Sequence, residues 1–390
     1  MNFKKLIERY KEGIATEEEI NIIEKEIEKY EAIEEYLADS VVLDFISPDD
    51  RGQDKDESQN LRKSVDKRLR KVVLSSVSIV LAIYLCLFYV ISPIVDNLYY
   101  NPTKVSIGER NQDLFYDLSV FIELNMPGYT VSSPKNAEGL GFGEYNIYVG
   151  RSKQLTLERE VINMKLERGR SINMNESLYP RSFVYFPGYT DSETFDEESI
   201  KRSNELGMNH LKQLNPVSYV SAYLTFNRDL NMEEFHELIW DNGAIKFIWA
   251  GIRTEGHDEN NIALTGFRLN QTAVPQTGDL PNKERYPAFD LYGWIYDTPN
   301  PHNWPEAYEL HYKSLLQYMV DREKAVLAFE HSTVKSKFYK SALEYVEENG
   351  VNTFGVMVFA EPKDLIEFVE NESVKAIQVD EVLASKRFIH

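Results

Sequence analysis

The stretch VVLSSVSIVLAIYLCLFYVISPI, residues 72–94, holds no charged side chain in 23 residues, and the rest of the chain is organised around it. As a helix rising about 1.5 Å per residue it spans roughly 34 Å, more than the roughly 30 Å of bilayer hydrocarbon. One alternative is a buried core helix, but such helices seldom run this long without a polar residue beyond serine. The run also starts too far from Met1, and is too long, for a cleaved signal peptide. It therefore predicts one transmembrane helix.

The two flanks of this run differ in charge. Basic residues crowd the N-terminal flank: Arg62, Lys63, Lys67, Arg68, Arg70 and Lys71. Asp96, Tyr99 and Tyr100 follow the run. Basic flanks stay in the cytoplasm and aromatic side chains favour the membrane interface. We therefore expect a single-pass cell-membrane protein in contact with the lipid bilayer, with its N-terminus cytoplasmic and its C-terminal domain extracytoplasmic.

The composition narrows the function classes. The chain has 390 residues, enough for two or three domains, and its net charge of −20 argues against direct nucleic-acid binding by the protein as a whole. Its one cysteine, Cys86, lies inside the apolar run, so the outer part has neither disulfides nor thiol chemistry. The 24 tyrosines and 20 phenylalanines indicate a folded outer domain that contains β-structure.

The segment before the run, residues 1–46, is predicted to be helical. Thr16 is an N-cap whose capping-box glutamate, Glu19, follows three residues later. Apolar residues recur at helical spacing on both sides of Gly13: Phe3, Leu6, Ile7 and Tyr10, then Ile20, Ile23, Ile27, Tyr30, Ile33 and Leu37. Two short helices bury too little surface to be stable alone. The apolar stripe therefore needs a partner, which is another segment of this chain, a second copy or a different protein.

Charge favours a basic partner for this segment. Residues 12–57 carry 17 acidic and 4 basic side chains, and opposite potentials speed and orient association. In the alternative interpretation the stripe folds back on residues 3–10. Residues 47–71 read as a flexible linker with the basic flank. Because Met1–Lys71 contains neither His nor Cys, a zinc motif is excluded there.

The outer part divides into an expected β-rich subdomain, residues 95–205, and an α+β sensor subdomain, residues 206–390. Leu98–Gly108 resembles an extended tether, Leu114–Leu124 is apolar with an ambiguous period, and Thr190–Glu205 reads as a loop or short helix. Four short runs alternate like strands of an antiparallel sheet: Glu144–Val149, Gln154–Leu157, Val161–Leu166 and Ser182–Phe186.

The sensor subdomain contains two similar strand–helix–strand units. The strands of the first are 217–226 and 244–249, and those of the second are 351–360 and 373–378. Each unit is too short to fold alone, so the two should share one sheet in a split-βαβ arrangement. Residues 305–349 between them are strongly helical, and Gly350 ends that region. The fold class expected is therefore α+β: an N-terminal helical cytoplasmic segment, one transmembrane helix, and an extracytoplasmic α/β domain with two repeats. A ligand-sensing sandwich and a duplication without a retained site both remain open.

Motifs for catalysis are absent. Gly139–Gly143 lacks the G-x-G-x-x-G spacing and reads as a turn, and neither G-x-S-x-G nor H-E-x-x-H occurs. Glu255–Glu259 offers one imidazole among carboxylates, which favours a surface loop over a metal site. We expect no enzyme activity, no metal and no cofactor.

Several apolar and turn patterns carry a resemblance to a known family. They are NLYYNP at residues 97–102, FIELNMPG at 121–128, and PVSYVSAYLTF at 216–226 with Trp249 beyond it. With the acidic helices and the single span, they resemble the sigma factor regulator N- and C-terminal domains of Firmicute membrane anti-sigma factors, of the Bacillus anti-sigma-M type. The resemblance covers about residues 61–382. The chain lacks the His and Cys ligands of zinc-containing anti-sigma factors, which leaves the geometry of a sigma contact open.

The resemblance implies that residues 1–46 sequester an extracytoplasmic-function sigma factor. The outer domain would then sense envelope stress or hold a second membrane protein, and release would follow a conformational change or proteolysis near Asn97–Gly108. The sigma-binding residues expected are Phe3, Leu6, Ile7, Tyr10, Glu17, Glu18, Ile20, Ile23, Glu24, Ile27, Tyr30, Glu31, Ile33 and Leu37. The alternatives are a membrane-anchored extracytoplasmic binding module without a sigma partner, and an extracytoplasmic enzyme that uses Glu255–Glu259.

Overall fold

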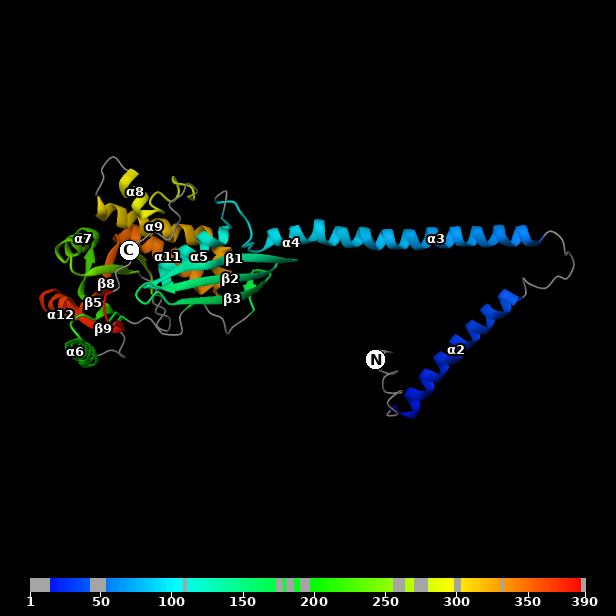
Figure 1. The fold of residues 1–390 in the computed structure, drawn as a ribbon, viewed down its shortest axis with the longest axis horizontal. Coiled ribbons are helices and arrows are strands. Elements are labelled where there is room, and N and C mark those ends of the chain that lie inside the picture. Colours follow the sequence, from blue (N-terminus) through cyan, green and yellow to red (C-terminus); the bar gives the residue numbers. More distant parts are fainter. Residues whose placement is uncertain are drawn as a thin grey trace. The chain divides into compact units, whose positions relative to one another are not determined.

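The fold is given by a computed structural model, drawn in Figure 1. It describes residues 15–42, 54–107, 111–172, 178–179, 186–189, 197–254, 264–269, 280–297, 303–330 and 333–386. The chain forms two compact units, Met1–Ala82 and Ile83–His390. The predicted α+β class is confirmed, because helices occur together with two sheets of four and five strands.

The apolar run is helical throughout, as predicted. Helix α3 (Asp54–Cys86) passes into a π-helical turn, η1 (Leu87–Ile91), and then into α4 (Ser92–Leu98). The π turn ends just before Pro93, which has no N–H to donate and so disturbs a regular helix. Within the part of the chain that the structure describes, Lys63–Leu98 is the one helix long and apolar enough to cross a membrane.

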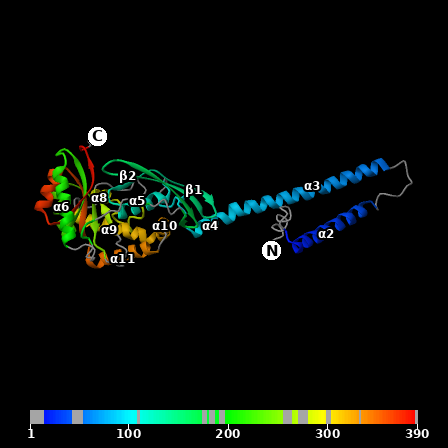
Figure 2. The ribbon, with the colours of Figure 1, turned by 90° about the horizontal axis from the view of Figure 1, so that it is seen from below.

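The smaller sheet is an antiparallel meander whose first strand begins at Tyr129. Its strands are β1 (Tyr129–Gly141), β2 (Glu144–Lys153), β3 (Arg159–Glu167) and β4 (Arg170–Ser171), in that order across the sheet. Strands β2 and β3 contain the predicted runs 144–149 and 161–166, which confirms both. Figure 2 shows β1 running toward α4.

One predicted strand of this sheet is wrong. Gln154–Leu157 forms the turn that joins β2 to β3, with the Leu157 N–H donating to the carbonyl of Lys153. The alternation of polar and apolar residues arises because Leu155 is buried against the larger sheet while Leu157 is exposed. Of the fourth predicted run, only Phe186 lies within the described residues.

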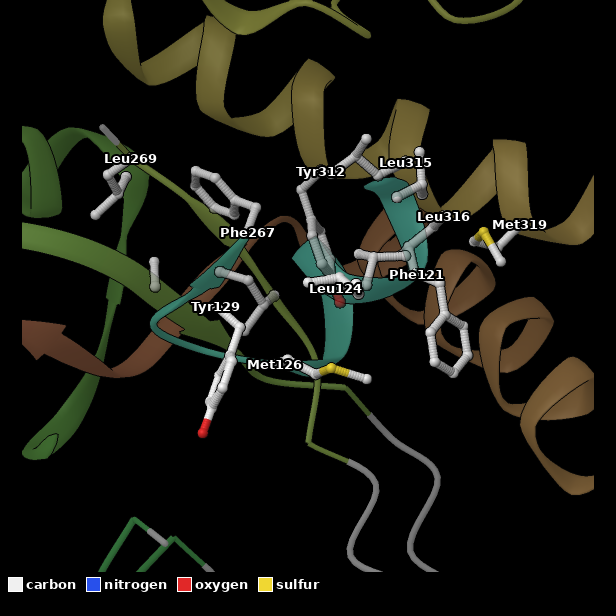
Figure 3. Close-up of a cluster of buried hydrophobic side chains, with 14 of the residues drawn as sticks. Phe121, Leu124, Met126, Tyr129, Phe267, Leu269, Tyr312, Leu315, Leu316 and Met319 are labelled. Carbon is white, nitrogen blue, oxygen red and sulfur yellow. The ribbon is translucent and has the colours of Figure 1, made fainter. Parts of the chain in front are cut away.

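Helix α5 (Asp113–Asn125) lies at the centre of the larger unit, and all thirteen of its residues are buried. A helix covered on every side has no solvent-facing side, which explains the ambiguous period of residues 114–124. It packs against β1 and against α9 (Trp304–Asp321). In Figure 3, Tyr312, Leu315 and Leu316 of α9 lie beside Phe121 and Leu124 of α5.

The larger sheet interleaves the two strand–helix–strand units. The first unit is β5 (Tyr219–Asn231), α7 (Met232–Asp241) and β6 (Lys246–Ile252), and the second is β8 (Asn352–Ala360), α12 (Pro362–Asn371) and β9 (Val374–Leu383). With β7 (Gly266–Arg268) at one edge, the strand order is β7-β6-β8-β5-β9 and all pairs are antiparallel. Each unit thus places a strand between the two strands of the other, which is the split-βαβ arrangement.

The two faces of the larger sheet are covered differently. Val220, Ala222 and Leu224 face the core that holds α7 and α12, whereas Tyr219 and Tyr223 face a second aromatic cluster with Phe186 and Leu155. Helix α6 (Glu197–Gln213) packs on β9 and beside α12, as Figure 1 shows. It is longer than the short helix predicted within 190–205.

The remaining helices come between the two strand–helix–strand units in the sequence. They are α8 (Leu291–Asp297), α9, α10 (Glu323–Phe329) and α11 (Val334–Asn349), so the predicted helical region 305–349 is confirmed. Gly350 caps α11 with φ of 78°, a left-handed conformation that favours glycine. The part of the chain between β6 and α9 contains β7 and α8.

Candidate functional site

The predicted partner-binding helix forms with its predicted start. Helix α2 spans Glu17–Val42, and its N-cap is Thr16. The backbone N–H of Thr16 donates to Glu19 Oε2 at 3.0 Å, and the N–H of Glu19 donates to Thr16 Oγ1 at 3.4 Å. This reciprocal pair is the predicted capping box.

The apolar stripe of α2 is exposed over its central turns. Ile27, Tyr30 and Ile33 are 45%, 72% and 55% exposed, whereas Ile23 is buried and Ile20 is half-buried. Glu18, Glu24 and Glu31 are all exposed around it. Glu17 and Leu37 belong to α2, but their side chains lie outside the described residues, as do Phe3, Leu6, Ile7 and Tyr10 entirely. We call Ile27, Tyr30 and Ile33 the apolar ridge; it can offer a partner helix side chains at three-residue spacing.

The C-terminal end of the candidate membrane helix is hydrogen-bonded to the turn between β1 and β2. The backbone N–H of Phe142 donates to Ser92 Oγ at 2.8 Å, and the N–H of Gly143 donates to Asp96 Oδ1 at 2.8 Å. Burial, and then the nearby carboxylate of Asp96, raises the pKa of the Tyr145 phenol. The Gly143 N–H and the Ser92 hydroxyl thus donate to the Asp96 carboxylate, and the Tyr145 phenol lies near it.

Close packing completes this junction. The rings of Phe88 and Phe142 meet edge to face with centroids 5.4 Å apart. Gly143 has φ of 79°, and a Cβ there would lie 3.4 Å from the ring of Tyr99 and 3.5 Å from Val95. The turn predicted at Gly139–Gly143 is therefore present, but its contact with the membrane helix was missed. The signal available was the four-residue spacing of Ser92 and Asp96, which places both on one helix face.

The segment after α4 is docked rather than a free tether. Tyr100 is buried, and its hydroxyl donates to Asp117 Oδ2 at 2.7 Å. Ser106 and Ile107 donate backbone N–H groups to Asp113 Oδ1 at 2.6 and 3.1 Å. The buried carboxylates of α5 thus fix the chain directly beyond the membrane helix.

A second polar cluster surrounds Glu123 at the other end of α5. His311 Nε2 lies 3.0 Å from Glu123 Oε1, and the backbone N–H of Arg268 donates to the same oxygen at 3.2 Å. The Trp249 indole donates to the Glu123 carbonyl at 2.7 Å. Burial alone would raise the pKa of Glu123, but the Arg268 charge and the His311 hydrogen bond lower it below the ordinary value. These residues come from α5, α9, β6 and β7, and no sequence motif joins them.

Comparison with known proteins gives two similarities. Residues 211–381 match the family described as sigma factor regulator C-terminal. The probable anti-sigma-M factor YhdL of Bacillus subtilis is 24% identical over 394 residues, which cover 97% of either chain. The chain resembles a membrane anti-sigma factor. No solved structure matches it.

The anti-sigma resemblance extends over both units, because the relative covers nearly the whole chain. The sigma factor regulator C-terminal match begins in α6 and contains β5 to β8 with most of β9, so it coincides with the split-βαβ sheet and the helices between its units. Helix α5 and the meander precede it.

An open pocket of about 460 Å³ lies where this matched region meets the meander. Its wall includes Lys153, Lys246 and Lys386 together with the rings of Tyr219 and Phe359. Lys153 forms an ion pair with Glu381, while the ammonium of Lys386 lies 5.4 Å from the centre of the Tyr219 ring. A cationic and aromatic lining in an acidic protein suits an anionic group with an apolar part.

Metal chemistry finds no support in the described residues, where no group of three His, Cys, Asp or Glu side chains could hold an ion. The segment Glu255–Glu259 lies outside them, so the metal interpretation of that segment stays untested.

Proposed function

We propose that this chain is a single-pass membrane anti-sigma factor that sequesters an extracytoplasmic-function sigma factor through its acidic N-terminal helices. The observation that carries the proposal is the apolar ridge of α2, Ile27, Tyr30 and Ile33, exposed on a strongly acidic helix. Exposed apolar side chains at helical spacing cost solvation free energy unless a partner covers them. The similarity to an anti-sigma factor over nearly the whole chain supports a sigma factor as that partner.

Orientation supports the same proposal. The basic flank before the membrane helix favours a cytoplasmic N-terminus, where RNA polymerase subunits are found. The helices of residues 1–46 would then cover basic surfaces of the sigma factor that otherwise contact DNA or core polymerase. An acidic segment suits such surfaces because opposite potentials orient the encounter.

The experiment places a charge in the ridge. The full-length Tyr30→Glu variant should no longer co-purify with the sigma factor encoded nearest to this chain's gene, and transcription from promoters of that sigma factor should rise. The matched control is Ala32→Glu, which adds the same charge about 160° around the helix from Tyr30. It should leave the complex intact.

Two results would contradict the proposal. If Tyr30→Glu and Ala32→Glu release the sigma factor equally, charge alone decides the result and the ridge is not the contact. If the unmodified chain retains no sigma factor, the alternative of a membrane-anchored extracytoplasmic binding module stands.

We further propose that the outer unit senses envelope stress. Hydrogen bonds from the β1–β2 turn to Ser92 and Asp96 support this, because a rearrangement of the meander would displace the end of the membrane helix. The lysine-lined pocket at the opposite end of the same hairpin is the candidate for a signal molecule, and Lys246→Glu should alter induction if it is one. The docked Tyr100 argues that proteolysis near Asn97–Gly108 would need this segment to detach first.

A further inference from the structure

The turn between β1 and β2 contacts the membrane helix at residues within its uncharged run 72–94. Its tip, residues 139–143, reads GLGFG. Phe142 packs its ring on Phe88, and its backbone N–H bonds to Ser92. Both partners lie inside the uncharged run 72–94.

The depth follows from the helix rise. Phe88 precedes the end of the run at Ile94 by six residues, which is about 9 Å along the axis. Asp96 is the first charged residue after the run, and it receives the N–H of Gly143 on the side of the turn nearer the strands. If the run occupies the roughly 30 Å of hydrocarbon, Asp96 marks the interface and Phe142 reaches below it.

Exposure at the tip points the same way. Leu140, two residues before Phe142, is 48% exposed. Apolar surface that is exposed to water does not stabilise the fold. At this depth the exposed surface of Leu140 would instead contact acyl chains, which removes it from water. Arg168 in the adjoining β3–β4 turn and Arg170 at the start of β4 are exposed as well, and the Arg168 N–H donates to the Gly143 carbonyl at 2.8 Å. Arginines beside an apolar tip are placed where lipid phosphates lie.

We propose that the GLGFG tip is a membrane-inserted wedge, with Leu140 and Phe142 in the outer leaflet and Arg168 at the level of the headgroups. The outer unit would then contact lipid at a second point besides its membrane helix. The inference rests on the proposed membrane crossing of residues 72–94. The meander would respond to the packing of the outer leaflet directly, because β1 and β2 lead from this tip to the pocket between the sheets.

The test is a measurement of depth with nitroxide labels on single cysteines. The full-length chain is reconstituted in vesicles of phosphatidylglycerol and phosphatidylcholine, and collisions of the label with oxygen and with a water-soluble nickel chelate are compared. Oxygen concentrates in the hydrocarbon and the chelate in water. Leu140→Cys and Leu157→Cys are made in a Cys86→Ser background, and the native Cys86 label serves as the reference inside the span.

Leu157 is a matched control, because it is a leucine of nearly equal exposure, 49%. It lies in the β2–β3 turn, at the end of β2 opposite to the GLGFG tip. The label at 140 should collide severalfold more with oxygen than with the chelate, as at Cys86, and the label at 157 should show the reverse. An Arg168→Cys label should lie between them.

Each outcome decides a different statement. A water-like label at 140 with a lipid-exposed label at Cys86 overturns the wedge and leaves the membrane span intact. Water-like labels at both 140 and 86 overturn the span itself. Equal behaviour at 140 and 157, with both lipid-exposed, would show that the hairpin lies flat on the surface and that the tip has no special role.

Discussion

Asp117 and Arg322 form a bidentate ion pair that joins α5 to the junction of α9 and α10, 205 residues later in the sequence. Arg322 donates from Nε to Asp117 Oδ1 at 2.7 Å and from Nη2 to Oδ2 at 2.6 Å. The hydroxyls of Tyr100 and Tyr318 complete the carboxylate at 2.7 and 2.8 Å. Asp117 is wholly buried, so its charge depends on these donors.

Arg322→Met should destabilise the larger unit strongly. The substitution leaves the charge of Asp117 buried with the two tyrosine hydroxyls alone, and removal of one partner from a buried pair costs about 3–5 kcal/mol. Urea unfolding of the full chain in detergent micelles measures it. Arg285→Met is the control, because Arg285 also forms two hydrogen bonds with one aspartate, Asp321, but on the exposed surface. A similar loss in both variants would refute the importance of burial here.

Tyr100→Phe should make the chain less sensitive to alkali. Burial, and then Asp117, raises the pKa of the Tyr100 phenol well above its ordinary value. The unfolded chain therefore loses this proton first, so the stability that Tyr100 contributes is present below about pH 10 and is lost above it. A plot of unfolding free energy against pH should be flatter for Tyr100→Phe than for the native chain. The exposed Tyr296→Phe should leave the slope unchanged, and an unchanged slope for Tyr100→Phe would contradict the prediction.

Glu123→Gln should remove part of the acid sensitivity of the fold. Arg268 and His311 hold the pKa of Glu123 below its ordinary value against the effect of burial. The contribution of the carboxylate is therefore complete above about pH 4.3 and is lost as the pH falls through the lower folded-state pKa. Thermal unfolding from pH 6 to pH 3 should show a shallower decline in the variant. Glu347→Gln, on the exposed side of α11, is the control.

Alanine at both Ser92 and Asp96 should loosen the β1–β2 turn without unfolding the sheet. The amides of Phe142 and Gly143 lose their acceptors, and a hydrogen bond to a charged group contributes about 1.5–3 kcal/mol. Hydrogen–deuterium exchange of residues 139–143 should quicken by about an order of magnitude. Exchange should stay unchanged in Asp66→Ala, which alters an exposed carboxylate of α3. Equal protection in the double variant would mean that ring packing alone holds the turn.

Salt should weaken the proposed sigma complex. If the acidic face of α2 meets a basic surface, raising the ionic strength from about 0.05 to about 0.5 M shortens the screening length and slows association. Association rates by surface plasmon resonance, with the chain in lipid nanodiscs, test this. Glu24→Lys with Glu31→Lys should reproduce the effect at low salt. An association rate that does not depend on salt would leave the apolar ridge as the sole basis of the contact.

Local patterns were enough to predict several elements. The capping box of Thr16 and Glu19, the uncharged run around Cys86 and the end of α11 at Gly350 each depend on residues in one continuous stretch of sequence, so the sequence reveals them. The two strand–helix–strand units could be predicted because strand and helix patterns alternate along each of them. In contrast, the alternation in Gln154–Leu157 reflects packing of a turn against another sheet, and it was mistaken for a strand.

The buried polar clusters could not be predicted for a physical reason. Asp117 meets Arg322, and Glu123 meets His311, only after α5 is enclosed by α9 and the meander. In an acidic chain each carboxylate has many possible partners, and nothing in the local sequence marks the ones that become buried. The contact between Ser92, Asp96 and the β1–β2 turn could be predicted only in part. Ser92 and Asp96 share a helix face, which the sequence shows, but the turn that they bind lies about fifty residues later.

Strand β8 occupies the middle of the larger sheet, although it comes after some nine-tenths of the chain in order of synthesis. Its neighbours β5 and β6 cannot complete their ladders until residues 352–360 are available. The larger unit therefore cannot complete its five-stranded sheet until residues 352–360 have been synthesised. A chain that stops before β8 would therefore lack the strand that joins β6 to β5.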